Sequence, residues 1–187
     1  PSIGGVGLIK DYRKMISMDL KEVDNLVLII GKTEGHIDQS LFARTILDEK
    51  NGPPPEVNLF NEKNNGESIL NLIDKGYVKS AHDISLGGLL VAISKMCIRG
   101  NKGIKINKSK NLMNEIEYFF AEDQGRYLIE VNKEDLKEVT KILNKNSVHH
   151  EELGIITQND MIINEKTKVT IDELKSYYTN WLTKYMS

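Results

Sequence analysis

Short hydrophobic runs alternate with helix-like spacing of hydrophobic residues along most of this 187-residue chain. Residues 26–30 are apolar without interruption, a pattern typical of a strand that is buried on both faces. Residues 4–9 are apolar and rich in glycine, which indicates a strand with close backbone neighbours. Strands are also predicted over residues 80–84, 104–106, 127–131, 153–157 and 161–163.

Hydrophobic residues that recur every three or four positions predict helices between these strands. Residues 88–98 are apolar on nearly every side, which indicates a helix at the centre of the fold. The last helix begins at a capping box of Thr170 and Glu173, and its aromatic stripe is expected to belong to the core. The stripe consists of Leu174, Tyr177, Tyr178, Trp181, Leu182 and Tyr185. The other predicted helices cover residues 37–46, a segment from about 61 or 67 to 75 with Gly76 at the left-handed C′ position, and residues 136–143.

This alternation of strands and helices predicts the fold class. It is α/β (mixed α+β), with a layered mixed sheet covered by helices, although the strand order does not follow from the pattern. Residues 51–55, Asn-Gly-Pro-Pro-Pro, interrupt the alternation. We interpret them as a stiff internal loop, because the roughly 50 residues before them are too few for a domain.

Composition and charge narrow the class of protein. There are 25 basic and 27 acidic residues, a net charge of −2, so the electrostatic footprint of a nucleic-acid-binding protein is absent. No apolar run approaches the ~20 residues of a membrane helix, so no membrane partner is expected. A single cysteine, Cys97, forms no internal disulfide and favours a reducing, cytoplasmic location, and we expect it to be a small core residue. The chain begins with Pro1, which leads us to expect a processed or excised piece of a longer protein.

Two signals for metal or phosphate binding fail on inspection. His149 and His150 are adjacent, and adjacent residues of a strand point to opposite faces, so a solvated pair is expected. Gly31-Lys32-Thr33 resembles the end of a phosphate-binding loop, but Leu26 stands where that loop needs its first glycine. We predict no metal site in this chain.

A first candidate site lies where the strand 80–84 meets the apolar helix. His82, Asp83 and Ser85 are polar, and Gly87 and Gly88 lead into the helix. Helix N-termini offer unpaired N–H groups to phosphate, Ser85 is a candidate cap, and Asp83 is placed to orient the imidazole of His82. The alternative is that the glycines allow tight packing and the polar residues satisfy a turn.

A second candidate site lies between Tyr118-Phe119-Phe120 and the strand 127–131. Glu122, Asp123 and Gln124 stand there beside Gly125 and Arg126. Such a cluster binds a polar ligand or a metal, or it ties the joint together through internal ion pairs and hydrogen bonds. The residues alone leave both interpretations open.

These motifs, in this order, carry a resemblance. Residues 4–9, 81–89 and 122–127 together resemble the last domain of the phosphoribosylformylglycinamidine synthases, which belong to the aminoimidazole ribonucleotide synthase superfamily. The similarity extends over nearly the whole chain, although residues 10–67 are less distinctive. Leu86 stands where relatives commonly carry an acid, which weakens a polar role for that turn, and Ala121 stands where they often have glycine.

The resemblance implies a parent enzyme, an ATP-dependent carbon–nitrogen ligase of purine biosynthesis. In the implied reaction, ATP and Mg²⁺ serve to activate the formamide oxygen of formylglycinamide ribonucleotide, and ammonia from a glutaminase component replaces that oxygen. The resemblance implies tentative nucleotide- or substrate-binding roles, and no catalytic one, for residues of both motifs. They are His82, Asp83, Ser85, Gly87, Gly88, Glu122, Asp123 and Gln124.

The resemblance also implies how the chain fits its parent. Residues 1–187 would be one C-terminal synthase-type domain, with residues 1–24 a candidate lead-in segment from a preceding ATP-handling domain. The chain alone would be inactive, because the residues that hold ATP and magnesium lie in upstream domains. Two alternatives remain: a non-catalytic nucleotide-binding or interface module, and the C-terminal domain of another superfamily member such as aminoimidazole ribonucleotide synthase.

Overall fold

The computed structural model describes residues 4–107 and 113–187. Its strands are β1 (Leu26–Ile30), β2 (Val78–Ile84), β3 (Gly103–Ile106), β4 (Arg126–Val131), β5 (His150–Thr157), β6 (Asp160–Ile163) and β7 (Thr167–Thr170). They form one sheet in the order β2-β4-β1-β5-β3-β6-β7, in which β3 and β6 are parallel and the other pairs antiparallel. The helices are α1 (Leu41–Thr45), α2 (Leu59–Asp74), α3 (Gly88–Gly100), α4 (Glu115–Phe120), α5 (Leu136–Lys145) and α6 (Ile171–Met186), and η1 (Tyr12–Lys14) is a 3₁₀ turn.

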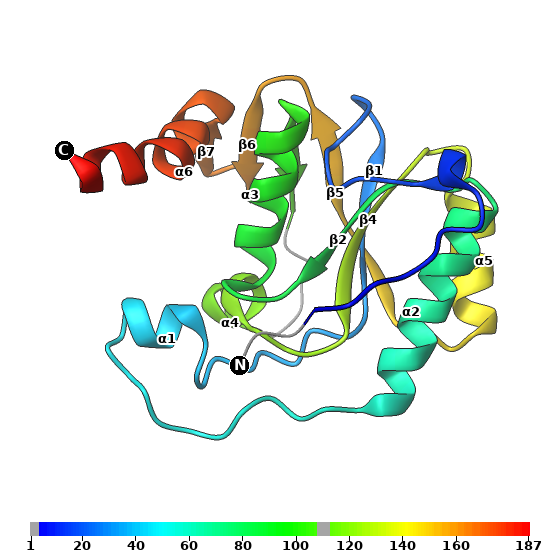
Figure 1. Cartoon of the computed structure of the whole chain (residues 1–187), viewed down its shortest axis with the longest axis horizontal. Helices are drawn as coiled ribbons and strands as arrows, with labels where there is room; N and C mark the ends of the chain where they lie inside the picture. The colour runs from blue at the N-terminus through cyan, green and yellow to red at the C-terminus, as the bar shows by residue number, and fades with distance from the viewer. Residues whose placement is uncertain (1–3, 108–112) are drawn as a thin grey trace.

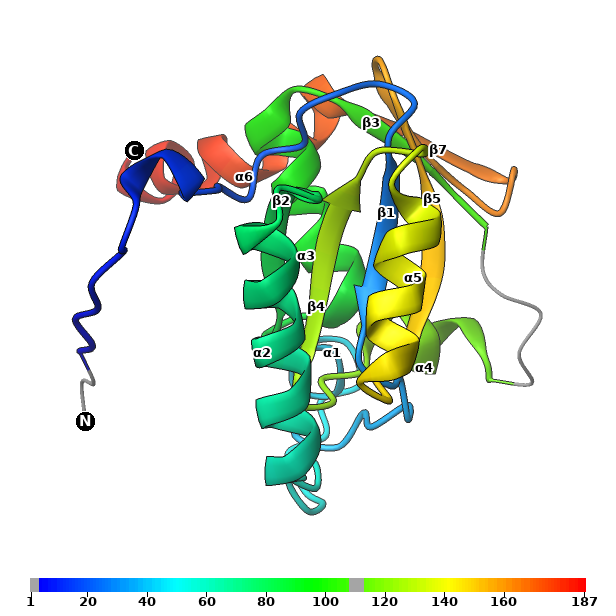
Figure 2. The ribbon, with the colours of Figure 1, turned by 90° about the vertical axis from the view of Figure 1, so that its right-hand side faces the viewer.

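Helices cover both faces of the sheet (Figure 1). Helices α3 and α4 pack on one face and α2 and α5 on the other, as the two views at right angles show (Figures 1 and 2). In β1, Val27 and Ile29 face α3, whereas Leu28 and Ile30 face α2 and α5. This burial on both sides explains the uninterrupted apolar run and confirms the predicted mixed sheet covered by helices.

Most predicted elements are confirmed, and the exceptions are short. The helix expected over residues 37–46 is reduced to α1, because the Ser40 hydroxyl accepts a hydrogen bond from the backbone N–H of Ala43 (3.1 Å) and begins the helix there. Sequence reasoning missed β7. Cys97 is buried, and burial raises the pKa of its thiol to about 12, so it is a core residue as predicted. No helix in the described part of the chain combines the length and apolarity that crossing a membrane requires.

The prediction of a strand over residues 4–9 is wrong within this chain. These residues are extended and exposed, and they pair with none of the described strands (Figure 2). The chain first meets the sheet at Ser17, which bridges Ser80 on the edge strand β2. A strand needs a hydrogen-bonded neighbour, and none of the described segments supplies one here.

The expectation that the aromatic stripe of the last helix belongs to the core is also wrong. Among the described side chains of α6, only Ile171 and Leu174 in its first turn reach the core. The remaining turns extend away from the body of the molecule (Figure 1). Tyr177, Tyr178, Trp181 and Tyr185 are exposed, and the side chain of Leu182 lies outside the described residues. The Thr170 cap is confirmed, since its hydroxyl accepts a hydrogen bond from the backbone N–H of Glu173 (3.1 Å).

This exposure gives a direct optical prediction, because Trp181 is the single tryptophan of the chain. Its side chain is 61% exposed, so we expect fluorescence of this chain at the long wavelength of solvated indole, with efficient quenching by acrylamide. Unfolding in urea should barely shift the emission. A blue-shifted emission that moves to longer wavelength on unfolding would contradict the observed position of α6.

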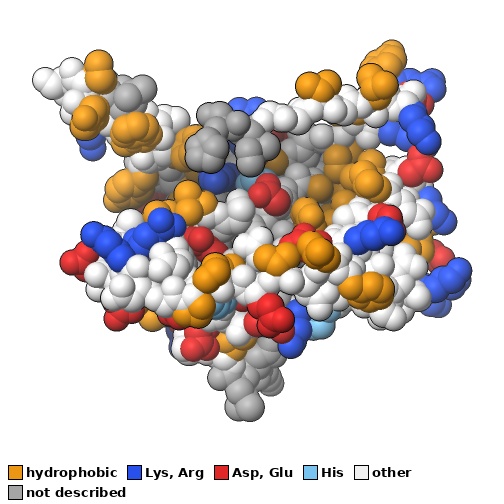
Figure 3. Space-filling model, turned by 60° about the horizontal axis from the view of Figure 1, so that its bottom comes forward, with side chains coloured by type: hydrophobic (Ala, Val, Ile, Leu, Met, Phe, Trp, Pro, Cys, Tyr) orange, Lys and Arg blue, Asp and Glu red, His pale blue; other side chains and the backbone are white. Residues whose placement is uncertain are grey.

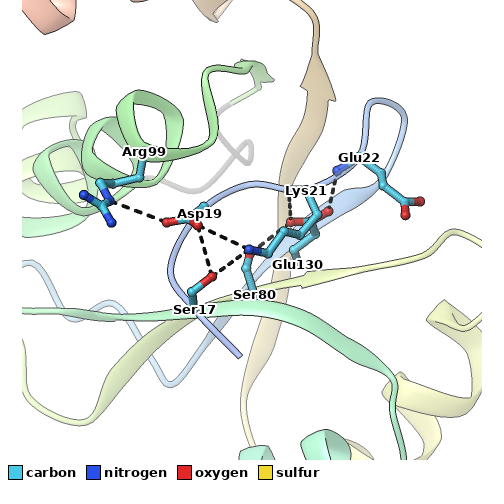
Figure 4. A network of polar contacts seen from close by, with 7 residues as sticks. All are labelled: Ser17, Asp19, Lys21, Glu22, Ser80, Arg99 and Glu130. Carbon is cyan, nitrogen blue, oxygen red and sulfur yellow. Dashed lines mark hydrogen bonds and ion pairs between the residues drawn. The ribbon is translucent and has the colours of Figure 1, made fainter. Parts of the chain in front are cut away.

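A buried carboxylate fixes the segment that precedes β1. Glu130 of β4 is fully buried and accepts hydrogen bonds from the backbone N–H groups of Lys21 (2.8 Å) and Glu22 (3.0 Å). It also accepts from Asn25 Nδ2 (2.8 Å) and Ser80 Oγ (2.9 Å). Figure 4 shows this network joining residues 17–22 to β2 and β4. One carboxylate in the sheet thus ties the end of the N-terminal segment to the core.

Candidate ligand-binding site at the joint between α4 and β4

The acidic motif lies where predicted, in the joint (residues 121–125) between α4 and β4. Both carboxylate oxygens of Asp123 are occupied by the backbone of the loop after β1. Oδ2 accepts from the N–H groups of Glu34 (3.0 Å) and Gly35 (3.2 Å), and Oδ1 accepts from His36 N–H (3.0 Å). Asp123 therefore acts first as an anchor for residues 34–36.

Glu122 joins three segments in the same way. Its Oε1 accepts from the backbone N–H of Leu41 at the start of α1 (2.7 Å) and from that of Gly87 before α3 (2.8 Å). Its own N–H donates to the carbonyl of His36 (3.0 Å). One carboxylate oxygen thus holds the two candidate motifs together, since Gly87 belongs to the first and Glu122 to the second.

Arg126 binds the same joint from inside the core. Its side chain is fully buried, and its Nη2 donates to the carbonyl of Ala121 (2.5 Å) and lies 3.7 Å from Asp123 Oδ2. Nη1 donates to the hydroxyl of Thr33 (3.1 Å). Burial lowers the pKa of Arg126, and the negative charge of Asp123 opposes that shift. Ion pairs and hydrogen bonds within the chain therefore do tie this joint together, which is one of the two interpretations that the sequence left open.

The two glycines of the first motif are required by the backbone. Gly87 and Gly88 have φ of 88° and 71°, the left-handed region that favours glycine. A Cβ on Gly88 would lie 2.7 Å from the carbonyl oxygen of Ala121, so the start of α3 packs directly against the joint. Ser85 does not cap α3, contrary to expectation, because Gly87 is the N-cap and makes no side-chain capping bond.

His82 and Asp83 are neighbours in space as well as in sequence. Nδ1 of His82 lies 3.1 Å from Oδ1 of Asp83, as expected for a carboxylate that orients the ring. The two side chains differ in exposure, at 17% for His82 and 58% for Asp83. Burial lowers the pKa of His82, Asp83 opposes this shift, and Lys95 on α3 adds to it. The lowered pKa favours the neutral form of the imidazole.

Two adjoining cavities lie at the joint. The joint cavity, of about 280 Å³, brings together Asp83, Ser85, Glu122, Asp123 and Gln124 from the two predicted motifs. Gly87, Gly88 and His82 do not line it; the glycines shape the turn behind it. Five predicted residues from separate parts of the chain therefore meet at one cavity.

The loop cavity, of about 670 Å³, lies between the loop after β1 and the N-terminal turns of α2. It shares Glu62, Asp123, Gln124 and Gly125 with the joint cavity. Its volume lies in the range of about 300–1,000 Å³ that is typical of small-molecule sites. Sequence reasoning missed the α2 residues, whose signal is a run of amides at one helix end; the lining includes Asn58, Asn61 and Asn65.

The charges of the loop cavity do not suit a triphosphate or a metal held by this chain alone. Lys32 pairs with Glu34 (2.7 Å), while Glu56, Glu62 and Asp123 add negative charge to the lining. Among the described residues, no group of three or more His, Cys, Asp or Glu side chains could hold a metal ion. The lower face of the molecule likewise mixes acidic, basic and hydrophobic side chains (Figure 3). The amide-rich lining fits an uncharged polar group, such as a ribose or the edge of a base.

Comparison with known proteins decides the family. Residues 22–164 match the family described as AIR synthase related protein, C-terminal domain. This chain belongs to the AIR synthase related proteins. The membership agrees with the resemblance carried by the motifs and with the mixed sheet described above.

A curated relative within this AIR synthase related family is the phosphoribosylformylglycinamidine synthase subunit PurL of Pelagibacter ubique. It is 66% identical over 186 residues, which are 100% of this chain and 26% of that protein. The chain thus spans about a quarter of the length of the relative.

Solved structures of the AIR synthase related fold agree with this assignment. The structure described as T. maritima PurL complexed with FGAR has a TM-score of 0.70 at 18% identity, covering 87% of this chain and 29% of that chain. T. maritima PurL complexed with ATP has a TM-score of 0.66 at 17% identity, covering 87% of this chain and 27% of that one. At such low identity these likenesses show the fold.

The hydrogen bonds of Glu122 and Asp123 predict different losses of stability for Glu122→Gln and Asp123→Asn in this AIR synthase related domain. Glu122→Gln keeps an oxygen for Leu41 and Gly87, so we expect it to cost less than about 1 kcal/mol of unfolding free energy, against about 2–3 for Glu122→Ala. In Asp123→Asn, the new amide NH₂ group would face backbone N–H groups, because both carboxylate oxygens of Asp123 accept hydrogen bonds. We therefore expect a loss of about 2–4 kcal/mol of unfolding free energy. Urea denaturation measures each loss. Equal losses for Glu122→Gln and Asp123→Asn would contradict these hydrogen-bond assignments.

Proposed function

We propose that this chain is the C-terminal part of a synthetase that converts formylglycinamide ribonucleotide to formylglycinamidine ribonucleotide in purine biosynthesis. The observation that carries the proposal is the 66% identity to the PurL subunit of Pelagibacter ubique over the full length of this chain. A chain that covers 26% of that relative is one portion of the enzyme. Alone, it is inactive.

The reaction we propose for the parent enzyme is an ATP-dependent carbon–nitrogen ligation. ATP supplies the chemistry that activates the formamide oxygen of the substrate, and ammonia replaces that oxygen. In this proposal the described residues of the chain bind and position ligands, and the reacting groups belong to other parts of the parent enzyme. They shape one wall of a ligand-binding cleft, through Asp83, Ser85 and Gln124 at the joint cavity and the amides of α2 at the loop cavity.

The binding roles proposed for the two motifs differ in kind. Glu122 and Asp123 act through backbone groups that they position. Both oxygens of Asp123 accept hydrogen bonds from residues 34–36, and Oε1 of Glu122 accepts from Leu41 and Gly87. Gln124 is exposed and lines both cavities, so it is the residue best placed to contact a nucleotide or substrate. Gly87 and Gly88 allow the close packing behind it, and Asp83 orients the imidazole of His82.

The charges described above support our proposal that the phosphates and Mg²⁺ of ATP bind to other parts of the protein. The partners we propose are upstream ATP-handling domains of the same polypeptide and a glutaminase component that supplies ammonia. The location we propose is the cytoplasm, with neither nucleic acid nor a membrane as partner.

Growth of a purine auxotroph tests this function. In a bacterial strain that lacks its own synthetase subunit, we expect the full-length parent protein to restore growth without added purine. The 187-residue chain expressed alone should not restore it. If the full-length protein is expressed in soluble form and growth still requires purine, the proposed function is wrong.

A second candidate is a non-catalytic nucleotide-binding module, which the size of the loop cavity favours. Calorimetry with ADP and Mg²⁺ distinguishes the two candidates. We expect no binding to the 187-residue chain, because the residues present do not suit phosphates. Clear binding by that chain, lost in Gln124→Ala with unchanged thermal stability, would favour the self-contained module.

A further inference from the structure

The sequence contains the dipeptide Asn-Gly twice, at residues 51–52 and at residues 65–66. In water this dipeptide undergoes a reaction of its own, because glycine has no side chain to shield its backbone nitrogen from the neighbouring asparagine side chain. In a folded protein the reaction occurs only where the backbone lets these two groups meet. The two copies therefore place one chemistry in two structural settings.

The first copy, Asn51-Gly52, lies in the loop between α1 and α2, which runs along the lower edge of the molecule in Figure 1. Both residues are exposed, and neither belongs to a helix or a strand. Within the described residues, no group forms a hydrogen bond with the side chain of Asn51 or with the backbone N–H of Gly52. The side-chain amide and the nitrogen that attacks it are therefore both available for reaction.

The second copy, Asn65-Gly66, lies inside α2, where the fold holds both groups. Asn65 is 6% exposed, and its Nδ2 donates to the carbonyl of Gly125 (2.9 Å). Gly66 lies in the interior of the helix, where each backbone N–H donates to the carbonyl four residues before it. The helix would have to open before the two groups could meet.

Glycine at position 52 is required by the backbone of the loop. Its φ is 107°, in the region that favours glycine, and a Cβ on it would lie 2.5 Å from Cγ of Asp38. Nε2 of Gln39 donates to the carbonyls of Lys50 (2.7 Å) and Gly52 (3.2 Å), so it holds the loop on both sides of Asn51. The loop thus needs glycine after Asn51, and this glycine leaves the asparagine side chain unshielded.

We propose that Asn51 is a site of spontaneous deamidation in the folded protein. The backbone nitrogen of Gly52 attacks Cγ of Asn51, a bond forms between these atoms, and the bond from Cγ to Nδ2 breaks. The leaving ammonia carries away the proton of the Gly52 N–H, and a cyclic succinimide remains. Water then opens this ring at either of its carbonyls, which gives aspartate or isoaspartate at position 51. Water is the only co-reactant, and it reaches this exposed loop.

Deamidation changes the rim of the loop cavity. The loop that contains the modified residue also supplies residues 55–56 to the lining of that cavity. The product adds a negative charge close to the carboxylate of Asp38, which lies against Gly52. Isoaspartate also adds one atom to the backbone between the two carbonyls that Gln39 holds. This inference goes beyond the proposed function, because the reaction involves no substrate of the enzyme.

Peptide mapping by mass spectrometry tests the proposal on the full-length parent protein, incubated in its folded state near neutral pH. The map separates the asparagine, aspartate and isoaspartate forms at each position. We expect deamidation at Asn51 to be at least about tenfold faster than at Asn65, because α2 must open before Asn65 reacts. In concentrated urea the two sites should react at similar rates, since only the fold distinguishes them.

Asn51→Ser removes the site and leaves Gly52 in place, so aspartate and isoaspartate should no longer form in this loop. The matched control is Asn180→Ser, which replaces an exposed asparagine that tryptophan follows, and it should leave the rate at Asn51 unchanged. Deamidation at Asn51 that is no faster than at Asn65 in the folded full-length protein would overturn the proposal. This comparison within the wild-type protein decides even if a variant fails to fold.

Discussion

Replacing Glu130 by alanine is expected to lower the free energy of unfolding by about 3–5 kcal/mol, one of the two largest effects of any single substitution described here. The carboxylate is fully buried and accepts hydrogen bonds from two backbone N–H groups, one amide and one hydroxyl. Alanine leaves the backbone N–H groups of Lys21 and Glu22 and the buried amide of Asn25 without their acceptor. Urea denaturation followed by circular dichroism measures the loss.

Two further variants keep this prediction open to contradiction if Glu130→Ala fails to fold. Glu130→Gln keeps one oxygen acceptor and should lose about half as much stability as alanine. The control Glu134→Ala removes an exposed glutamate just beyond β4 and should stay within about 0.5 kcal/mol of the original chain. A Glu130→Ala protein as stable as this control would show that the network of Figure 4 does not hold the N-terminal segment.

Replacing Arg126 by methionine should cost about 3–5 kcal/mol, because it removes a buried cation and leaves its partners unpaired. The guanidinium reaches the carbonyl of Ala121, the hydroxyl of Thr33 and the carboxylate of Asp123 at once. Arg126→Lys should recover little of this loss, since an ammonium on a flexible stem does not reproduce the planar fork. Thermal and urea denaturation measure both variants.

Arg99→Met is the matched control for Arg126→Met. The side chain of Arg99 is 66% exposed and pairs with Asp19 at 3.5 Å, so its removal should cost at most about 1 kcal/mol. A loss at Arg126 no larger than at Arg99 would contradict the role of Arg126 as the core of the joint. It would also show that the Asp123 carboxylate, which anchors residues 34–36, does not depend on the charge of Arg126.

The sheet could be predicted from the sequence because burial on both faces leaves a direct trace. β1 is apolar throughout, since Val27 and Leu28 face opposite helical layers, and α3 is apolar on nearly every side. Glu130 is an acidic residue within an otherwise apolar strand, which is a sequence signal for a buried carboxylate. A buried carboxylate in such a position requires several donors, but these lie 50–109 residues away along the chain.

The exposure of two apolar surfaces could not be predicted in this way. The stripe of α6 and the segment 4–9 show hydrophobic spacing that indicates burial, yet Trp181 and Val6 are exposed in this chain. Periodicity shows that a face is apolar and does not show which partner covers it. The predicted burial therefore failed at the two parts of the chain that lie outside the matched domain, residues 22–164.

The sequence predicted which residues belong to the candidate site, but it did not predict their hydrogen bonds. The two motifs meet, since Glu122 accepts from Gly87 and five of the predicted residues line the joint cavity. The occupation of Glu122 and Asp123 by residues 34–41 followed from no local pattern, because those partners lie more than 80 positions away. Ser85 had the residue type of a helix cap, but the left-handed Gly87 took that position.

The central claim is that this chain is an inactive portion of an amidine-forming synthetase, and product formation tests it most directly. Purified full-length protein and the purified 187-residue chain are each supplied with formylglycinamide ribonucleotide, ATP, Mg²⁺ and ammonium, and the amidine is measured by mass spectrometry. The account predicts ATP-dependent amidine from the full-length protein and none from the chain. Amidine formed by the chain alone, or none formed by the folded full-length protein, would contradict it.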